Sequence, residues 1–145
     1  MAVTTYPFLK GIGHILDGTI DLDTDAIKAA VLEDTYTPAQ ATDEFWDEIS
    51  AHEAAADDYV AGGAALTVSV VLDAVGMEVE IDAVDLEDEW IPAGPTGRYV
   101  VFYQDTGVAA TSALISWQNL GANTALSGVT FNAEGLLKLT LATPA

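Results

Sequence analysis

The residues whose spacing comes closest to a binding site are three aspartates at alternate positions, Asp21, Asp23 and Asp25. Carboxylates are the hard oxygen ligands that Ca²⁺ and Mg²⁺ prefer, and the D-x-D-x-D spacing resembles the beginning of a calcium-binding loop. The pattern then breaks, because Ala26 stands where the loop needs a glycine and Leu32 where it needs a bidentate glutamate. We therefore interpret the aspartates as a solvated acidic edge, with a structural Ca²⁺ or Mg²⁺ site as the alternative.

Residues suited to catalysis are scarce in this chain. It has no cysteine, and its two histidines, His14 and His52, form neither an H-E-x-x-H motif nor another zinc-binding pair. No G-x-S-x-G motif marks a serine nucleophile, and no glycine-rich loop is complete enough to bind phosphate. The acidic run at 85–89 has no glycine turn to organise ligands, so we interpret it as a solvated loop. We predict no catalytic residue, no cofactor and no enzymatic activity.

Three tryptophans raise sugar binding as a competing function, because flat aromatic side chains can serve as stacking platforms. Trp117 lies in an apolar, strand-like segment, and Trp46 lies on the inward face of an expected helix. Only Trp90, beside Pro92 and the acidic run, is then a candidate for the surface. We keep a carbohydrate-binding module for host attachment as an alternative function.

The charge balance argues against several classes of partner. The chain carries 23 acidic residues against four basic ones, which gives a formal net charge of −19. Binding to nucleic acid or to an anionic membrane requires a basic patch, so neither partner is expected. Repulsion among so many carboxylates is screened at molar salt, where the Debye length falls to about 3 Å. Because half of the residues are apolar, we expect a folded protein from a high-salt environment.

Segments of alternating apolar residues, separated by glycine, proline, asparagine and aspartate, recur along the chain. They predict an all-β fold in one domain over residues 1–145: an antiparallel, jelly-roll-like β-sandwich of about seven to nine strands with one short helix. Two segments should form a hairpin around Gly76, with Glu78, Glu80 and Asp82 on its solvated face. The expected strands are 26–32, 66–75, 77–84, 98–104, 113–117, 129–132 and 136–141.

The one helix is expected over residues 42–56, where Thr42 would cap the N-terminus and acids follow in the first turn. Phe45, Trp46 and Ile49 would share the face that packs on the sheet. The N-terminal segment 1–16 is apolar with few charges. We expect it to form a strand, or an arm that docks on a neighbouring chain.

Six short motifs span nearly the whole chain in a fixed order. They are IDLDTDAIKAAVL at 20–32, YTP at 36–38, DEFW at 43–46, YVAGGAAL at 59–66, GRYVVFY at 97–103 and EGLLKL at 134–139. This set resembles a widespread family of tailed-virus virion structural proteins. Gly97 stands where that family usually has alanine and Leu136 where it has isoleucine, and neither change affects a structural role. The motifs contain turn glycines, strand cores and a helix cap, so they specify a fold and mark no reaction centre.

The resemblance implies a virion structural role. Together with the acidic composition, it suggests a capsid decoration or turret component on the capsid surface of a halophilic archaeal tailed virus, with a tail accessory protein as an alternative. Expected partners are the major capsid protein or other virion proteins and further copies of this chain, as a homotrimer or, as the rival, a homopentamer. The N-terminal segment and the C-terminal segment 136–145 are nearly free of acids, so we expect them to form the contacts between copies.

Overall fold

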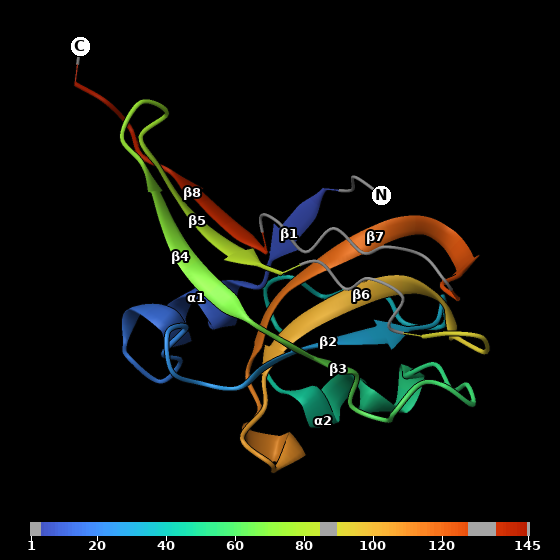
Figure 1. Ribbon diagram of the computed structural model, residues 1–145. Coiled ribbons are helices and arrows are strands. Elements are labelled where there is room, and N and C mark those ends of the chain that lie inside the picture. The colour runs from blue at the N-terminus through green and yellow to red at the C-terminus, as the bar shows by residue number, and fades with distance from the viewer. Residues whose placement is uncertain (1–3, 85–89, 128–135, 145) are drawn as a thin grey trace.

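The computed structural model describes residues 4–84, 90–127 and 136–144. Within these ranges the chain forms two antiparallel sheets (Figure 1). The five-stranded sheet has the order β1-β7-β6-β2-β3, and the three-stranded sheet has the order β4-β5-β8. The predicted all-β, sandwich-like fold is therefore confirmed. The strands are β1 Thr5–Pro7, β2 Ile27–Leu32, β3 Ala64–Leu66, β4 Val68–Asp73, β5 Glu78–Ala83, β6 Thr96–Gln104, β7 Leu114–Ala125 and β8 Leu137–Thr140.

The centre of the larger sheet is buried on both faces. Val100 and Phe102 of β6 belong to a core cluster that also contains Ile81 of the smaller sheet. The alternate residues Val101 and Tyr103 belong to a second cluster on the opposite face. A strand with one solvated face would alternate apolar and polar residues, whereas burial on both sides explains the uninterrupted run Tyr-Val-Val-Phe-Tyr.

Most predicted strands are present, although several ends are shifted. The segment 66–75 is divided at Thr67, where the chain passes from β3 in the larger sheet to β4 in the smaller one. Strand β7 continues past the predicted end at Trp117 as far as Ala125. The predicted strand 129–132 lies outside the described residues.

The helix predicted over residues 42–56 was wrong in its length and its start. The structure has only α2, Trp46–Ile49, with one turn of 3-10 helix after it. Thr42 does not cap a helix, because the Asp43 carboxylate accepts a hydrogen bond of 2.7 Å from the Tyr36 hydroxyl and holds the preceding residues in a turn. Phe45 is still extended. The predicted burial of Trp46 and Ile49 is confirmed.

The N-terminal segment combines a strand with a helix that the sequence did not predict. Strand β1 pairs with β7 of the same chain, and α1, Leu9–Leu16, follows it. Gly11 and Gly13 each destabilise a helix by about 1 kcal/mol relative to alanine. Because of these two glycines, the sequence pattern did not predict α1. Gly11 allows α1 to lie close to β7, because a Cβ there would collide with the backbone carbonyl of Leu114.

The remaining helical elements are single turns of 3-10 helix. They are η1 Ser50–His52 and η2 Ala109–Thr111. None of the helices in the described ranges has the length and apolar character needed to span a membrane.

Candidate functional site

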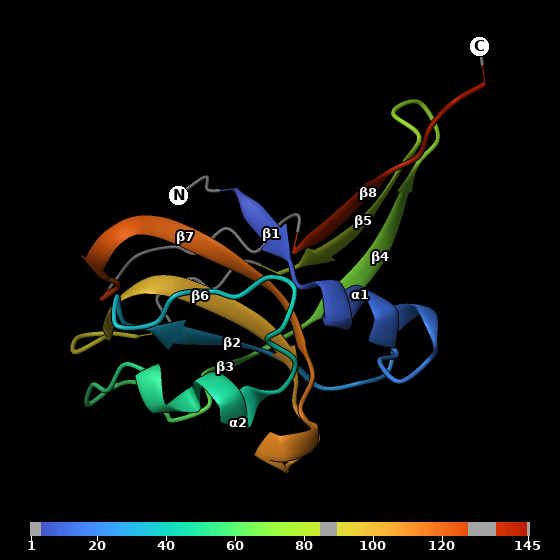
Figure 2. The same cartoon turned by 180° about the vertical axis from the view of Figure 1, so that it is seen from behind.

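The smaller sheet projects from the body of the molecule as an arm (Figures 1 and 2). We call residues 68–83 and 137–141, which contain β4, β5 and β8, the β-arm. In both views the β4–β5 turn lies far from the larger sheet, and the C-terminal end of the chain extends past it. Within that turn the Asp73 carboxylate accepts hydrogen bonds from the backbone N–H groups of Gly76 (3.0 Å) and Val75 (2.9 Å). These bonds hold the pKa of Asp73 below its ordinary value.

Strand pairing divides the side chains of the β-arm between two faces, because directly paired residues of antiparallel strands point to the same side. The first face is entirely apolar and carries Val68, Val70, Leu72, Val79, Ile81, Ala83, Leu137 and Leu139. The second face carries Ser69, Val71, Asp73, Glu78, Glu80, Asp82, Lys138 and Thr140. All four acids of the β-arm therefore lie on the second face. Three of them, Glu78, Glu80 and Asp82, were predicted to share a solvated face, and the strand pairing confirms that they lie on one face.

The apolar face is buried only at its base. Ile81 is 5% exposed and belongs to the core between the sheets. Further out, Leu139 is 55% exposed and Leu72 is 75% exposed, and Val75 in the turn is 97% exposed. Apolar surface that continues from the core onto a projecting element marks a contact site. A small sheet with one solvated apolar face also gains stability when that face is covered.

An apolar groove with a volume of about 350 Å³ lies between α1 and the apolar face of the β-arm. Ile12, Ile15 and Leu16 of α1 line it on one side, and Val79 and Leu139 of the β-arm line it on the other. Because the last two residues also belong to the apolar face, the groove and the face form one continuous surface. The sequence did not predict this groove, since it did not predict α1.

Among the described residues that line the groove, Lys138 is the only charged one. It extends from β8 on the acidic side, where its ammonium group lies 2.8 Å from the Glu78 carboxylate. The hydrogen bond to Glu78 raises the pKa of Lys138 above its ordinary value. The positive charge at the rim of the groove is thus already engaged within the chain.

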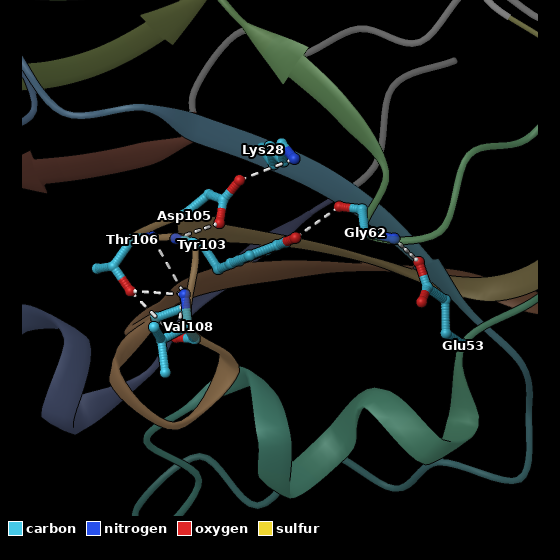
Figure 3. A network of polar contacts seen from close by, with 9 residues as sticks. Lys28, Glu53, Gly62, Tyr103, Asp105, Thr106 and Val108 are labelled. Carbon is cyan, nitrogen blue, oxygen red and sulfur yellow. Dashed lines mark hydrogen bonds and ion pairs between the residues drawn. The ribbon is translucent and has the colours of Figure 1, made fainter.

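A second cavity, of about 400 Å³, lies beside α2 and has both polar and apolar walls. Figure 3 shows the polar contacts among several residues that line it. The Tyr103 hydroxyl donates a hydrogen bond of 2.6 Å to the Gly62 carbonyl, and the Gly62 N–H donates one of 2.6 Å to Glu53. The Lys28 ammonium lies 2.8 Å from the Asp105 carboxylate and holds the pKa of that carboxyl below its ordinary value. These groups bind one another, so their arrangement fastens the loop before β3 to the end of β6.

The same close-up shows how the connection between β6 and β7 is closed (Figure 3). The Thr106 hydroxyl donates a hydrogen bond of 3.0 Å to the Val108 carbonyl, and the Ser112 hydroxyl donates to the same carbonyl at 2.9 Å. The connection between β6 and β7 is therefore stabilised by its own side chains, and Ser112, which lines the nearby cavity, is used in this connection.

The three aspartates predicted as weak metal ligands are used in local turns. Asp25 accepts hydrogen bonds from the Asp21 N–H (2.8 Å) and from the Gln104 side-chain amide (2.6 Å). Asp21 in turn accepts one from the Asp23 N–H at 3.0 Å. Aspartates often bind backbone N–H groups two residues further along in this way. Over the described ranges, no three His, Cys, Asp or Glu side chains gather as a metal site would require.

The tryptophans are all buried, with exposed fractions of 7% for Trp46, 4% for Trp90 and 8% for Trp117. Trp90, the one tryptophan considered as a candidate for the surface, is buried instead: its ring packs edge-on against Tyr59 in the core between the sheets, at a centroid distance of 5.5 Å. Trp46 stacks on Tyr103 at 4.6 Å. The indole faces are therefore occupied by the protein itself.

The two histidines lie in separate places and each has a polar neighbour. His14 Nε2 on α1 lies 2.9 Å from Glu44 Oε1, and His52 Nδ1 lies 3.0 Å from the Thr35 hydroxyl. The structure does not bring them together as a zinc pair. The acidic run 85–89 lies outside the described residues.

Comparison with known proteins found no family model, no curated protein and no solved structure that matches the chain. The β-arm, with its exposed apolar face, is the candidate functional surface of the described residues.

Proposed function

We propose that the protein is a non-enzymatic virion structural protein, a capsid decoration or turret component of a tailed virus adapted to high salt. The observation that carries this proposal is the continuous apolar surface of the β-arm and groove, which a monomeric protein would leave in water. Its partners are further copies of this chain, as a trimer in preference to a pentamer, and the major capsid protein or other virion proteins. The family resemblance in the sequence supplies the virion context.

The distribution of charge supports adaptation to high salt. Three of the four basic residues are engaged in ion pairs, namely Lys10 with Glu44, Lys28 with Asp105 and Lys138 with Glu78. The fourth, Arg98, donates a hydrogen bond to Asn119 and lies against the Tyr99 ring. The remaining carboxylates thus depend on dissolved cations for screening. The same arrangement leaves no basic patch for nucleic acid in the part of the chain that the structure describes.

The alternatives are a tail accessory protein and a carbohydrate-binding module for host attachment. The carbohydrate alternative rested on an exposed tryptophan, and the burial of Trp90 removes its main support. The tail alternative uses the same contact surface, so only the position in the particle separates it from capsid decoration.

The experiment that tests the proposal is localisation in purified particles. Particles of the virus that encodes this chain are kept in about 2 M NaCl and examined by cryo-electron microscopy with antibody fragments against the chain. An antibody against the major capsid protein is the control. We expect label on the capsid shell at its local symmetry axes. Label confined to the tail would favour the tail alternative, and absence from the particle would contradict a virion role.

A further inference from the structure

We infer that the apolar face of the β-arm and the groove beside α1 form the surface on which the β-arm of a second copy of this chain packs. This inference rests on the proposed virion role and names the contact through which the oligomer forms. Each copy carries both halves of the contact: the exposed apolar residues at the outer end of β4 and in the β4–β5 turn, and the groove between α1 and the strands β5 and β8.

The first argument is that the tip and the groove match in chemistry. Leu72 and Val75 are exposed at the outer end of the β-arm, and the exposed Leu141 is held at the same end by a hydrogen bond of 2.8 Å from its N–H to the Met77 carbonyl. The groove is walled by aliphatic side chains of α1 and the β-arm. Seating such a tip in such a groove removes both from water without leaving a polar group unpaired.

The second argument is charge, and it selects a copy of the same chain as the occupant. Two copies that each carry −19 repel one another unless they meet on a surface without carboxylates. No acid is present among the described residues of the apolar face and the groove, whereas all the acids of the β-arm lie on its opposite face. A cationic partner would instead be attracted to that acidic face. The apolar surface is therefore suited to a partner that shares the charge of this chain.

The third argument is the arrangement of the edges. In the order β4-β5-β8, both outer strands of the β-arm have one side without a partner strand among the described residues. An open edge beside an exposed apolar face favours association with another chain. Tip-to-groove contacts repeated around a ring produce a closed trimer or pentamer, and a reciprocal exchange between two copies produces a dimer.

The test is the mass of the protein in about 2 M NaCl, measured by light scattering after size-exclusion chromatography for the wild type and two matched variants. Leu72→Asp places a charge on the apolar face, where Leu72 is 75% exposed. Val71→Asp places the same charge on the neighbouring residue of the same strand, which lies on the acidic face and is 43% exposed. Circular dichroism confirms that each variant is folded.

We expect an oligomer for the wild type and for Val71→Asp. Leu72→Asp should raise the dissociation constant at least about tenfold, because a carboxylate in an apolar contact loses its hydration. Equal masses for Leu72→Asp and the wild type would overturn the inference, as would dissociation by Val71→Asp alone.

A cross-linking experiment tests the other half of the contact, because the chain has no cysteine of its own. Chains with Leu72→Cys are mixed with chains carrying Leu16→Cys at the groove, where Leu16 is 81% exposed, and a short bis-maleimide is added. We expect a cross-linked pair that contains one chain of each kind. Chains with Val71→Cys in place of Leu72→Cys are the control and should give a clearly weaker band. Equal bands would contradict tip-to-groove packing.

The two proposals fail in different ways. A chain that is found on the capsid but is monomeric in solution, or that associates through another surface, leaves the virion role in place and overturns this contact. A dimer supports the contact and contradicts the proposed trimer. A chain that associates as expected but is absent from particles contradicts the virion role alone.

Discussion

Replacing Gly63 by alanine should destabilise the protein for two separate reasons, both visible in the structure. Gly63 has a φ of +87°, which costs a residue with a Cβ about 1–2 kcal/mol. The new Cβ would also collide with the backbone carbonyl of Ala29 in β2, next to the pairing of β2 with β3. Overpacking of this kind costs about 1–3 kcal/mol, and a backbone carbonyl held in a sheet has little freedom to yield. The expected loss in the free energy of unfolding is about 2–5 kcal/mol.

Gly18 provides the matched control, because its φ is +84° and nothing lies within 4 Å of the position of a Cβ. Gly18→Ala should therefore lose only the free energy that a positive φ costs a residue with a Cβ, about 1–2 kcal/mol. The assay is denaturant unfolding of both variants in about 2 M NaCl, together with thermal unfolding, where 1 kcal/mol corresponds to about 2–4 °C for a chain of this size. If the two variants differ by less than about 0.5 kcal/mol, the close approach of Gly63 to β2 is refuted.

Three further predictions concern salt, pH and metal. The melting temperature should rise steeply between about 0.1 M and 2 M NaCl, because screening weakens repulsion among the carboxylates; an equal or higher value in dilute salt would remove the argument for a high-salt source. The folded-state pKa of Asp105 is lowered by Lys28, so wild type should exceed Asp105→Asn in stability above about pH 4. That advantage should be no more than about 1 kcal/mol and should vanish as the pH falls through the folded-state pKa; an advantage that grows at low pH would have the wrong sign. Adding CaCl₂ at constant ionic strength should leave the melting temperature unchanged, whereas a rise that is lost in Asp21→Asn would establish a metal site.

The fold class could be predicted from the sequence because the strands follow simple alternation. In β5 an acid stands at every second position, and β2 and β6 contain the apolar runs 29–32 and 99–103. The division at Thr67 could not be predicted, since a strand that passes from one sheet to another has the same local pattern as an uninterrupted one. The same holds for the extension of β7 beyond Trp117, which depends on pairing with β6.

The apolar surface formed by the β-arm and the groove could be predicted only in part. The apolar character of the C-terminal segment is visible in the sequence, but the groove depends on α1, whose two glycines favour a loop. Gly11 is explained by its packing against Leu114, which is remote in sequence. The burial of Trp90 likewise depends on Tyr59, a residue that no local pattern connects to it. Each of these features depends on packing between residues that are remote in sequence. The local sequence pattern carries no information about such contacts.

The separation of the β-arm into two faces also constrains how it folds. If β5 were to pair with β4 or β8 one residue out of register, every side chain of β5 would move to the other side of the sheet. Glu78, Glu80 and Asp82 would then enter the groove, and Val79 and Ile81 would face water. Burial of unpaired carboxylates costs several kcal/mol, so the slipped arrangement is strongly disfavoured. Alternate acids therefore protect a thin, projecting sheet from mispairing while the chain is folding.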